Sequence, residues 1–236
     1  MPLARALSKL GIASRTEARR LIEAGRVTVR GHIVTDPERI VEPERTPLAI
    51  DGQPLDRPAP VTIMLHKPRG VVTTRSDPEG RPTVYDLIQH AGMHLIPVGR
   101  LDLASTGLLL FTNDTRLADW LTDPASRLVR EYVVTVRGRL EDDTAARIEQ
   151  GFDVDNQRLR AKRVLVRKRS SRETHLIVEL VEGKNREIRR LMKAVGHEVT
   201  RLKRVSFGSL RLGDLEPGRW RNVTEEELAT LTQSRS

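Results

Sequence analysis

A single carboxylate stands out in the sequence because of its neighbours. Asp102 lies two residues after Arg100 and shortly before the apolar run Leu108–Leu110. An ionised carboxylate held next to a cation can act as a nucleophile. An aspartate in a glycine-bounded loop is also a common turn or cap residue, so this segment alone leaves a catalytic and a structural interpretation open.

Other kinds of active centre are poorly supported. The chain contains no cysteine, which excludes a disulfide framework, a thiolate metal site and a thiol nucleophile. Of the six histidines, only His90 and His94 share an i,i+4 spacing, and Gly92 between them disfavours a rigid helical metal pair. Gly183-Lys184 lacks the upstream glycine of a phosphate-binding loop. We therefore expect no metal ion and no cofactor.

The charge of the chain favours a polyanionic partner. The 236 residues carry a formal net charge of +9, and the sequence pI is about 10.5. The excess is concentrated in residues 1–30, 158–172 and 184–204, and the second of these blocks has no acidic residue. Separate basic blocks can converge on one face and follow a phosphate backbone. Solvated faces that never meet remain the alternative, especially for a hairpin at 158–172.

The first fifty residues form a predicted module of two helices and a small β unit. Leu3, Leu7 and Leu10 recur at helical spacing, and Ser14 with Glu17 is typical of a capping box that opens a second helix. Residues 27–29 and 33–34 then alternate as strands around a turn. Three arginines are expected on the outer face of the second helix, and these are Arg15, Arg19 and Arg20.

The stretch SRTEARRLIEAGRVTVRG in this module resembles the small RNA-binding domain named after ribosomal small-subunit protein four. The resemblance covers residues 2 to about 50 and implies docking onto structured RNA. Residues 53–60 contain three prolines and no periodicity, so they predict a linker. We accordingly expect an RNA-binding domain at 1–52, a linker at 53–60 and a catalytic domain at 61–236.

The remainder of the chain predicts an α+β domain. Strand-like apolar runs at 61–65, 108–111, 132–136 and 176–181 alternate irregularly with helical runs at 84–90, 116–121, 144–150 and 186–195. No glycine-rich phosphate loop follows a strand. A mixed, mostly antiparallel sheet flanked by helices is therefore favoured over a doubly wound parallel sheet.

Four ordered segments of this second part resemble the RsuA/RluB/RluE/RluF family of ribosomal RNA pseudouridine synthases. They are HKPRGVVTTRSDPEGRPTVYDLI at 66–88, GRLDLASTGLLLFTND at 99–114, REYVVTVRG at 130–138 and EGKNREIRRLMKAVGHEVTRLKRVSFG at 182–208. With the N-terminal module, the resemblance spans nearly the whole chain. It implies the pseudouridine synthase fold and the conversion of uridine to pseudouridine.

The resemblance also implies roles for individual residues. Asp102 is implied as the nucleophile, Tyr132 as the residue beside the target uracil, and Arg189 as the basic partner of the carboxylate. Arg100 is implied to occupy the space that the extruded nucleotide leaves. Uridine must be flipped out of its stack, at a cost of a few kcal/mol, and basic residues can offset that cost. The expected RNA contacts are Arg100, Lys67, Arg69, Arg15, Arg19, Arg20, Lys184, Asn185 and Arg186.

Three positions depart from the pattern of the family. Ala104 stands where an acidic or amide residue is usual, Glu187 where glutamine is commonest, and Thr115 where glycine usually follows TND. Arg130 replaces the usual lysine and keeps its charge. Because Asp102, Tyr132 and Arg189 are all present, the departures bear on fine placement or on substrate choice more than on the reaction.

We therefore expect a cofactor-free, monomeric enzyme that converts a specific uridine of ribosomal RNA, or of a pre-ribosomal particle, to pseudouridine. 23S RNA is favoured over 16S RNA because DPEGRPTVYDLI is closer to the RluB/RluE branch. The chain has no apolar run long enough to span a membrane and no secretory signal pattern, so we expect it in the cytoplasm. The alternative is a non-catalytic, ribosome-associated RNA-binding or assembly factor, which would not require Asp102.

Overall fold

A computed structural model describes residues 1–42, 45–55, 59–91 and 95–233. The chain divides into two compact units. The first comprises Met1–Val61, Ala91–Ile96 and Thr112–Thr115, and the second comprises Thr62–His90, Pro97–Phe111 and Arg116–Ser236. Within the described residues, no helix has the length and apolar character that a membrane crossing requires.

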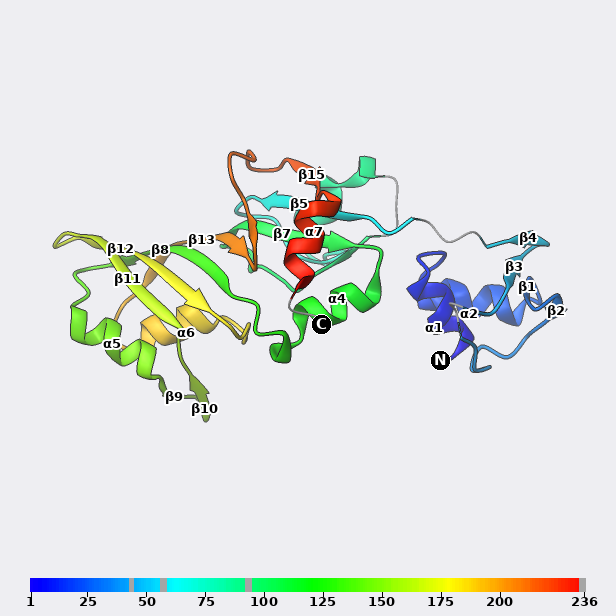
Figure 1. The fold of residues 1–236 in the computed structure, drawn as a ribbon, viewed down its shortest axis with the longest axis horizontal. Coiled ribbons are helices and arrows are strands. Elements are labelled where there is room, and N and C mark those ends of the chain that lie inside the picture. The colour runs from blue at the N-terminus through cyan, green and yellow to red at the C-terminus, as the bar shows by residue number, and fades with distance from the viewer. Residues whose placement is uncertain (43–44, 56–58, 92–94, 234–236) are drawn as a thin grey trace. The chain divides into compact units, whose positions relative to one another are not determined.

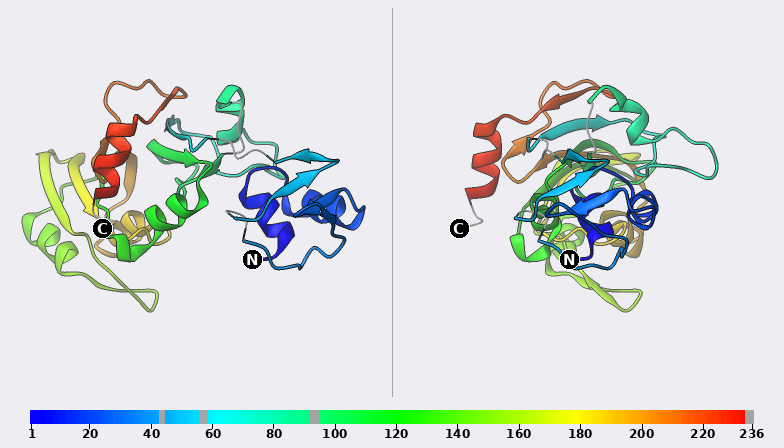
Figure 2. Two further views of the ribbon diagram at one scale, coloured as in Figure 1. Left: turned by 45° about the vertical axis from the view of Figure 1, so that its right-hand side comes forward. Right: turned by 90° about the vertical axis from the view of Figure 1, so that its right-hand side faces the viewer.

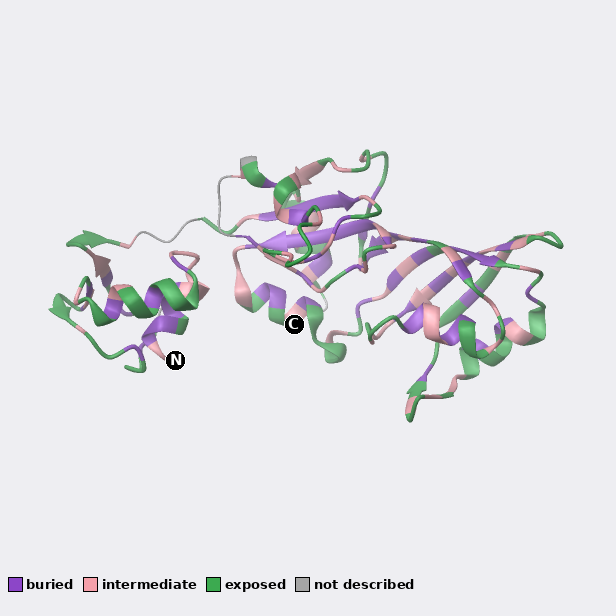
Figure 3. Cartoon of the chain, turned by 180° about the vertical axis from the view of Figure 1, so that it is seen from behind, coloured by how far each residue is buried: buried purple, intermediate pink, exposed green. Residues whose placement is uncertain are grey.

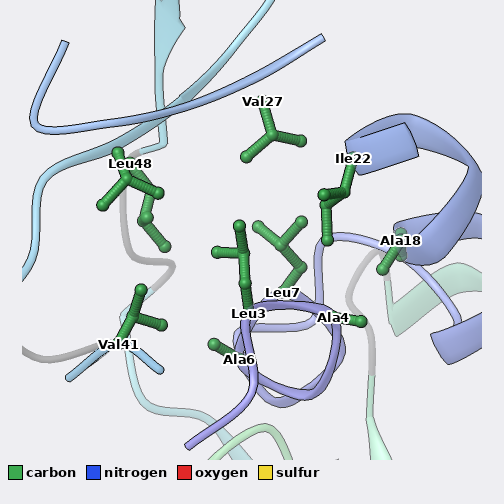
Figure 4. Close-up of a cluster of buried hydrophobic side chains, with 11 residues drawn as sticks. Leu3, Ala4, Ala6, Leu7, Ala18, Ile22, Val27, Val41 and Leu48 are labelled. Carbon is green, nitrogen blue, oxygen red and sulfur yellow. The ribbon is translucent and has the colours of Figure 1, made fainter. Parts of the chain in front are cut away.

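The N-terminal module begins with two helices and ends with a four-stranded sheet (Figure 1). The helices are α1 (Leu3–Lys9) and α2 (Arg15–Glu23), and the strands are β1 (Val27–Val29), β2 (His32–Ile33), β3 (Leu48–Ile50) and β4 (Gln53–Pro54), in the order β2-β1-β3-β4. Figure 4 shows Leu3 and Leu7 of α1 close to Ile22 of α2 and to Val27 of β1. All four side chains are fully buried, so the apolar stripe of each helix forms the core of the module.

The start of α2 explains why its arginines face outward. The side-chain oxygen of Ser14 accepts a hydrogen bond of 3.2 Å from the backbone N–H of Glu17, which is one half of the predicted capping box. This cap fixes the helix so that Ala18 and Ile22 are buried. Arg15, Arg19 and Arg20 are consequently all exposed, as the sequence predicts.

The segment predicted as a linker begins later than expected. Gln53 and Pro54 form β4, which pairs with β3 through Ala49 and Ile50. Proline is tolerated there because β4 is an edge strand, where a missing N–H donor leaves no neighbouring strand unpaired. Residues 56–58 lie outside the described part of the chain.

The second unit is built around a nine-stranded sheet. Its main path runs β11-β12-β8-β13-β7-β5-β15, with β14 paired to β13 and β6 paired to β7. Every strand pair whose direction is given is antiparallel except β13 with β7, which is parallel. The strands are β5 (Thr62–Lys67), β6 (Ile96–Pro97), β7 (Thr106–Thr112), β8 (Arg130–Arg137), β11 (Arg163–Arg169), β12 (Glu173–Leu180), β13 (Val199–Phe207), β14 (Leu210–Arg211) and β15 (Trp220–Asn222).

Helices and one hairpin surround this sheet. The helices are α3 (Val84–Leu87), α4 (Thr115–Thr122), α5 (Asp142–Gln150), α6 (Glu187–Ala194) and α7 (Glu225–Thr232), and short 3₁₀ turns lie at Gln89–Ala91 and Pro124–Ser126. The hairpin of β9 (Phe152–Val154) and β10 (Gln157–Leu159) projects away from the sheet in Figures 1 and 2. The mixed, mostly antiparallel sheet flanked by helices confirms the predicted α+β fold.

Burial differs along the sheet. Every residue of β5 is buried, as are six of the seven residues of β7, and both strands are purple in Figure 3. In contrast, β12 alternates strictly between buried and half-buried positions. The continuous apolar runs therefore mark strands that are covered on both faces, whereas alternation marks a strand with one exposed face.

The parallel pairing of β7 with β13 depends on one glycine. Gly107 pairs with Arg204 and has a φ of +110°. A Cβ atom at this position would lie 2.2 Å from the carbonyl oxygen of Arg204, which is far inside a van der Waals contact. Only glycine combines this backbone angle with so close an approach of the two strands.

Candidate active site

An open cleft of about 170 Å³ lies wholly within the second unit. Four segments that are distant in the sequence line it, namely 98–102, 130–132, 183–188 and 202–207. They belong to the loop before β7, the start of β8, the start of α6 and the second half of β13. The cleft contains Asp102, Tyr132, Arg186 and Arg204.

The parallel strand pair explains how these segments come together. Lys203 of β13 pairs with Thr106 at the start of β7, so the loop before β7 lies alongside the first half of β13. Arg189 of α6 connects the two segments. Its Nη1 donates to the carbonyl of Val199 at 3.0 Å, and its Nη2 donates to the carbonyl of Ala104 at 3.4 Å. The helix α6 is thereby fixed next to the loop that carries Asp102.

Asp102 lies at the mouth of the cleft between two guanidinium groups. Its side chain is 34% exposed, and its Oδ2 atom lies 3.4 Å from Nη1 of Arg186 and 4.0 Å from Nε of Arg189. The predicted carboxylate and its predicted basic partner are therefore neighbours. Arg186 is a second and closer cation that the sequence assigned only to RNA contact.

Arg189 is largely buried, with a side chain that is 14% exposed. Burial lowers the pKa of its guanidinium, and the neighbouring charges of Arg186 and Arg69 lower the pKa further, whereas Asp102 raises it. The Nε atom of Arg189 is buried without a hydrogen-bond partner among the described residues. The helix thus presents an unsatisfied donor towards the carboxylate of Asp102.

Lys67 lies inside the protein, against the loop that carries Asp102. The prediction that Lys67 contacts RNA is wrong. The residue is fully buried. Its Nζ donates to the backbone carbonyls of Pro68 at 3.0 Å, Asp102 at 3.1 Å and Ser105 at 2.9 Å. Burial lowers the pKa of Lys67 to about 8, and the charge of Asp102 opposes that shift. All three donors of the ammonium are used inside the protein, so none is available to a phosphate.

Tyr132 lines the cleft from β8. It is 8% exposed, and it pairs in the sheet with Val178 of β12 and with Arg204 of β13. Strands on both sides therefore fix its backbone. The ring is placed where it can stack on a planar ligand that enters the cleft.

The inner wall of the cleft contains charged residues that sequence reasoning did not place there. Arg130 and Arg204 are both about 95% buried, and their guanidinium carbons lie 4.9 Å and 5.4 Å from the ring centre of Phe207. Glu187 is buried beside them, and burial raises the pKa of its carboxyl group. Arg204 occupies an inward position of β13, a strand that the sequence patterns did not predict.

Most of the side chains of this wall have backbone partners. Arg130 donates to the carbonyls of Leu128, Leu121 and Val181, and Nε of Arg204 donates to Leu108 at 2.7 Å. Nη2 of Arg204 is buried without a partner among the described residues.

The three departures from the family pattern lie at different places. Ala104 supplies a carbonyl to which Arg189 donates, Thr115 begins α4, and Glu187 lies in the inner wall of the cleft.

The other predicted site residues fall into two groups. Arg100 and Lys184 line the cleft, and Arg69 and Asn185 are exposed in the same unit. Arg15, Arg19 and Arg20 belong to the N-terminal module and are not part of the cleft. Arg19 forms ion pairs with Glu38 at 2.9 Å and Glu23 at 3.7 Å, so its charge is partly compensated. In the described part of the chain, no group of three or more potential ligand residues could hold a metal ion.

Comparisons with known proteins agree with this fold. A family profile described as "RNA pseudouridylate synthase" matches residues 61–194, and a profile described as "S4 domain" matches residues 1–46. The chain also resembles a solved structure described as "Crystal structure of pseudouridylate synthase", with a TM-score of 0.67 and 24% identity over 98% of this chain and 99% of the other. That likeness shows the fold.

Curated relatives extend the match over nearly the whole chain. An "Uncharacterized RNA pseudouridine synthase" of Aquifex aeolicus is 35% identical, covering 95% of this chain and 91% of the relative. A "Ribosomal large subunit pseudouridine synthase B" of Bacillus subtilis is 33% identical over 97% and 94%, and one of Salmonella typhimurium is 38% identical over 96% and 79%. With these matches to both its sequence and its fold, the chain belongs to the RNA pseudouridylate synthase family and is an RNA pseudouridine synthase.

Proposed function

We propose that this enzyme converts a specific uridine of ribosomal RNA to pseudouridine, that the RNA is 23S rather than 16S, and that Asp102 is the nucleophile. The names of the relatives from Bacillus subtilis and Salmonella typhimurium support the large-subunit RNA as substrate. We place the reaction in the cytoplasm. We also propose that the enzyme acts as a monomer.

The observation that carries the proposal is the position of Asp102. Its carboxylate is the acidic group at the mouth of the cleft, two guanidinium groups lie within 4.0 Å of one of its oxygens, and the side chain is still a third exposed. The two cations hold the carboxylate in place, and the exposure leaves a carboxylate oxygen open to a substrate.

The reaction consumes no oxidant, reductant or group donor, because product and substrate contain the same atoms at the same oxidation level. The bond between ribose C1′ and uracil N1 breaks, the freed ring turns within the cleft, and a bond forms between C1′ and C5 of the ring. The hydrogen on C5 is lost as a proton, and N1 gains one. In our proposal Asp102 forms the transient bond to the nucleotide, Arg189 holds its carboxylate, and Tyr132 stacks on the uracil.

The remaining proposed roles concern RNA. We propose that residues 1–52 act as an RNA-binding domain through the exposed arginines 15, 19 and 20, and that Arg69, Lys184, Asn185 and Arg186 contact the backbone near the cleft. Arg100 fills the space that the everted nucleotide leaves. The profile described as "S4 domain" supports the first of these roles.

The test compares Asp102→Asn with wild type on 23S and 16S RNA from a strain that lacks this enzyme. Pseudouridines are mapped by carbodiimide labelling and primer extension, and RNA affinity is measured separately. We expect wild type to restore one 23S site, and Asp102→Asn to bind RNA within a few-fold of wild type yet modify nothing. Asp153→Asn, an exposed aspartate of β9, is the matched control and should retain activity.

Each other outcome overturns a defined part of the proposal. Modification by Asp102→Asn would exclude Asp102 as the nucleophile. A restored site in 16S RNA would exclude the large-subunit assignment. If wild type modified neither RNA, ribosomal RNA would be excluded as the substrate.

A further inference from the structure

The surroundings of Asp102 contain more positive charge than one carboxylate can balance. Arg186 and Arg189 both face its Oδ2 atom, and the charge of Arg69 also acts on Arg189. Arg69 and Arg186 are exposed, whereas Arg189 is largely buried. Two guanidinium groups beside a single carboxylate leave a net positive charge at this side of the cleft, where a second anion could bind.

The carboxylate is shared unevenly between its two cations. Its Oδ2 atom is closer to the exposed Arg186, at 3.4 Å, than to Nε of the buried Arg189, at 4.0 Å. That Nε has no hydrogen-bond partner among the described residues. A buried donor without an acceptor is unfavourable, and the carboxylate oxygen that could accept from it lies about 1 Å beyond the usual hydrogen-bond length.

Arg186 is held weakly in its place. Its side chain is 52% exposed, and the contact with Asp102 is the one side-chain hydrogen bond given for it in the described residues. Its backbone has a φ of +48°, in the left-handed region that residues other than glycine rarely adopt, immediately before α6. Such backbone strain clusters at functional sites, where the surrounding structure maintains it.

We propose that Arg186 is a phosphate-responsive positioning residue. It holds Asp102 away from Arg189 until an RNA phosphate next to the target uridine replaces Asp102 as the partner of Arg186. The inference rests on the proposed role of Asp102. When Arg186 turns to the phosphate, the carboxylate moves about 1 Å onto the free Nε of Arg189. The nucleophile therefore reaches its reactive position only when the RNA backbone is engaged.

The chemistry of the two partners favours this exchange. A guanidinium binds a phosphate through two parallel hydrogen bonds, whereas Arg186 makes one long contact with Asp102. RNA binding also removes water from the rim, which strengthens every charge pair there. Arg189 cannot make the same exchange because carbonyls of Val199 and Ala104 hold its two terminal nitrogens inside the protein.

The experiment uses full-length enzyme and a stem-loop RNA that contains the target uridine. In separate substrates, one phosphate flanking the target is replaced by a neutral methylphosphonate, and single-turnover rates are measured at saturating enzyme. Wild type, Arg186→Gln and Lys193→Gln are compared. Lys193 is the matched control because it is an exposed cation at the other end of α6.

For one of the two linkages we expect wild type and Lys193→Gln to slow by tenfold or more. Arg186→Gln binds RNA more weakly, but we expect it to process the charged and neutral substrates at equal rates. It should also be faster than wild type on the neutral one, because no cation then holds Asp102 back. A merely structural role for Arg186 would not produce this rescue.

Two results would overturn the inference. In the first, neither neutral linkage changes the saturated rate of wild type. In the second, Arg186→Gln slows as much as wild type on the neutral substrate. Both are separable from a failure of the proposed function, which would appear as activity of Asp102→Asn on the unmodified RNA.

Discussion

The ammonium group of Lys67 donates a hydrogen bond of 3.1 Å to the backbone carbonyl of Asp102. The same group also donates to the carbonyls of Pro68 and Ser105, so one buried cation holds both ends of a short loop. The side chain of Asp102 projects from this loop towards α6. The position of the carboxylate thus depends on a residue that lies beneath it and does not reach the substrate.

Replacing Lys67 by methionine should affect catalysis more than RNA binding. The three carbonyls lose their donor, and the loop that carries Asp102 is no longer fixed. We expect the single-turnover rate to fall by roughly tenfold or more, since small misplacements of reacting groups are costly, while RNA affinity stays within a few-fold. Single-turnover kinetics and filter binding measure the two quantities. Loss of affinity with an unchanged rate would contradict this assignment of Lys67.

The same variant should change how stability depends on pH. Burial lowers the pKa of Lys67 to about 8 in the folded protein, from 10.5 in the unfolded chain. Between these values the unfolded chain binds more protons, so the contribution of Lys67 to the free energy of unfolding rises with pH. We expect the difference in unfolding free energy between wild type and Lys67→Met to increase from pH 8 to pH 10. Urea titrations at several pH values would show a flat difference if the pKa were unshifted.

Gly107→Ala should be strongly destabilising. A Cβ atom would collide with the carbonyl of Arg204 and would also require a residue other than glycine at a φ of +110°. The strain and the overpacking together predict a loss of about 2–5 kcal/mol in the free energy of unfolding. Gly80→Ala is the control, because it has a φ of +68° but nothing within 4 Å of the new atom, and it should lose about 1–2 kcal/mol. Equal losses in the two variants would exclude the collision.

The arginines of α2 should contribute to the salt dependence of RNA binding. Removing one cation that neutralises a phosphate reduces the slope of log affinity against log salt by about 0.7–0.9. Because Arg19 is already paired with Glu38, we expect the triple change of Arg15, Arg19 and Arg20 to glutamine to reduce the slope by about 1.4–1.8, the value for two cations, rather than by the value of about 2.1–2.7 for three. Affinities measured from about 50 to 200 mM salt provide the slope. An unchanged slope would place the RNA on another face of the module.

Protonation of Glu227 in acid should destabilise the C-terminal helix α7. Two hydrogen bonds of 2.7 Å from Arg221 are the main reason that the pKa of Glu227 falls to about 2, and its carboxylate also caps α7 through the N–H of Thr224. A lowered folded pKa stabilises the protein above pH 4.5, and this contribution is lost as the pH falls from 4.5 towards 2. Thermal melts should show a larger loss in wild type and in the neighbouring control Glu226→Gln than in Glu227→Gln, in which Asp77 and other carboxylates of lowered pKa still titrate. A parallel acid response in all three proteins would contradict the assignment.

Local patterns in the sequence predicted the local structure well. The helix α2 and its serine cap, the β1–β2 hairpin and the buried strand β7 all follow from residue spacing within about ten positions. The grouping of Asp102 with Arg189 followed from a resemblance to a family. The spacing of the residues could not have shown it, because 87 positions separate the two.

The sequence could not predict contacts that depend on distant segments. Lys67 resembles a surface cation next to a proline and a glycine, and its burial is set by carbonyls that lie more than thirty residues later. Arg204 lies inward on β13 because Gly107, which is 97 positions earlier, allows the strands to meet. Both residues support the cleft by donating hydrogen bonds to backbone carbonyls of distant segments. A sequence motif describes side chains, so it cannot indicate such contacts.

The pairing of β13 with β7 also determines when a growing polypeptide becomes an enzyme. A nascent chain that ends at residue 198 already contains the aspartate, the tyrosine and the arginine, but it lacks the strand whose carbonyl anchors α6 beside the loop before β7. These three groups can therefore be held in their final arrangement only after the residues beyond 198 have been synthesised.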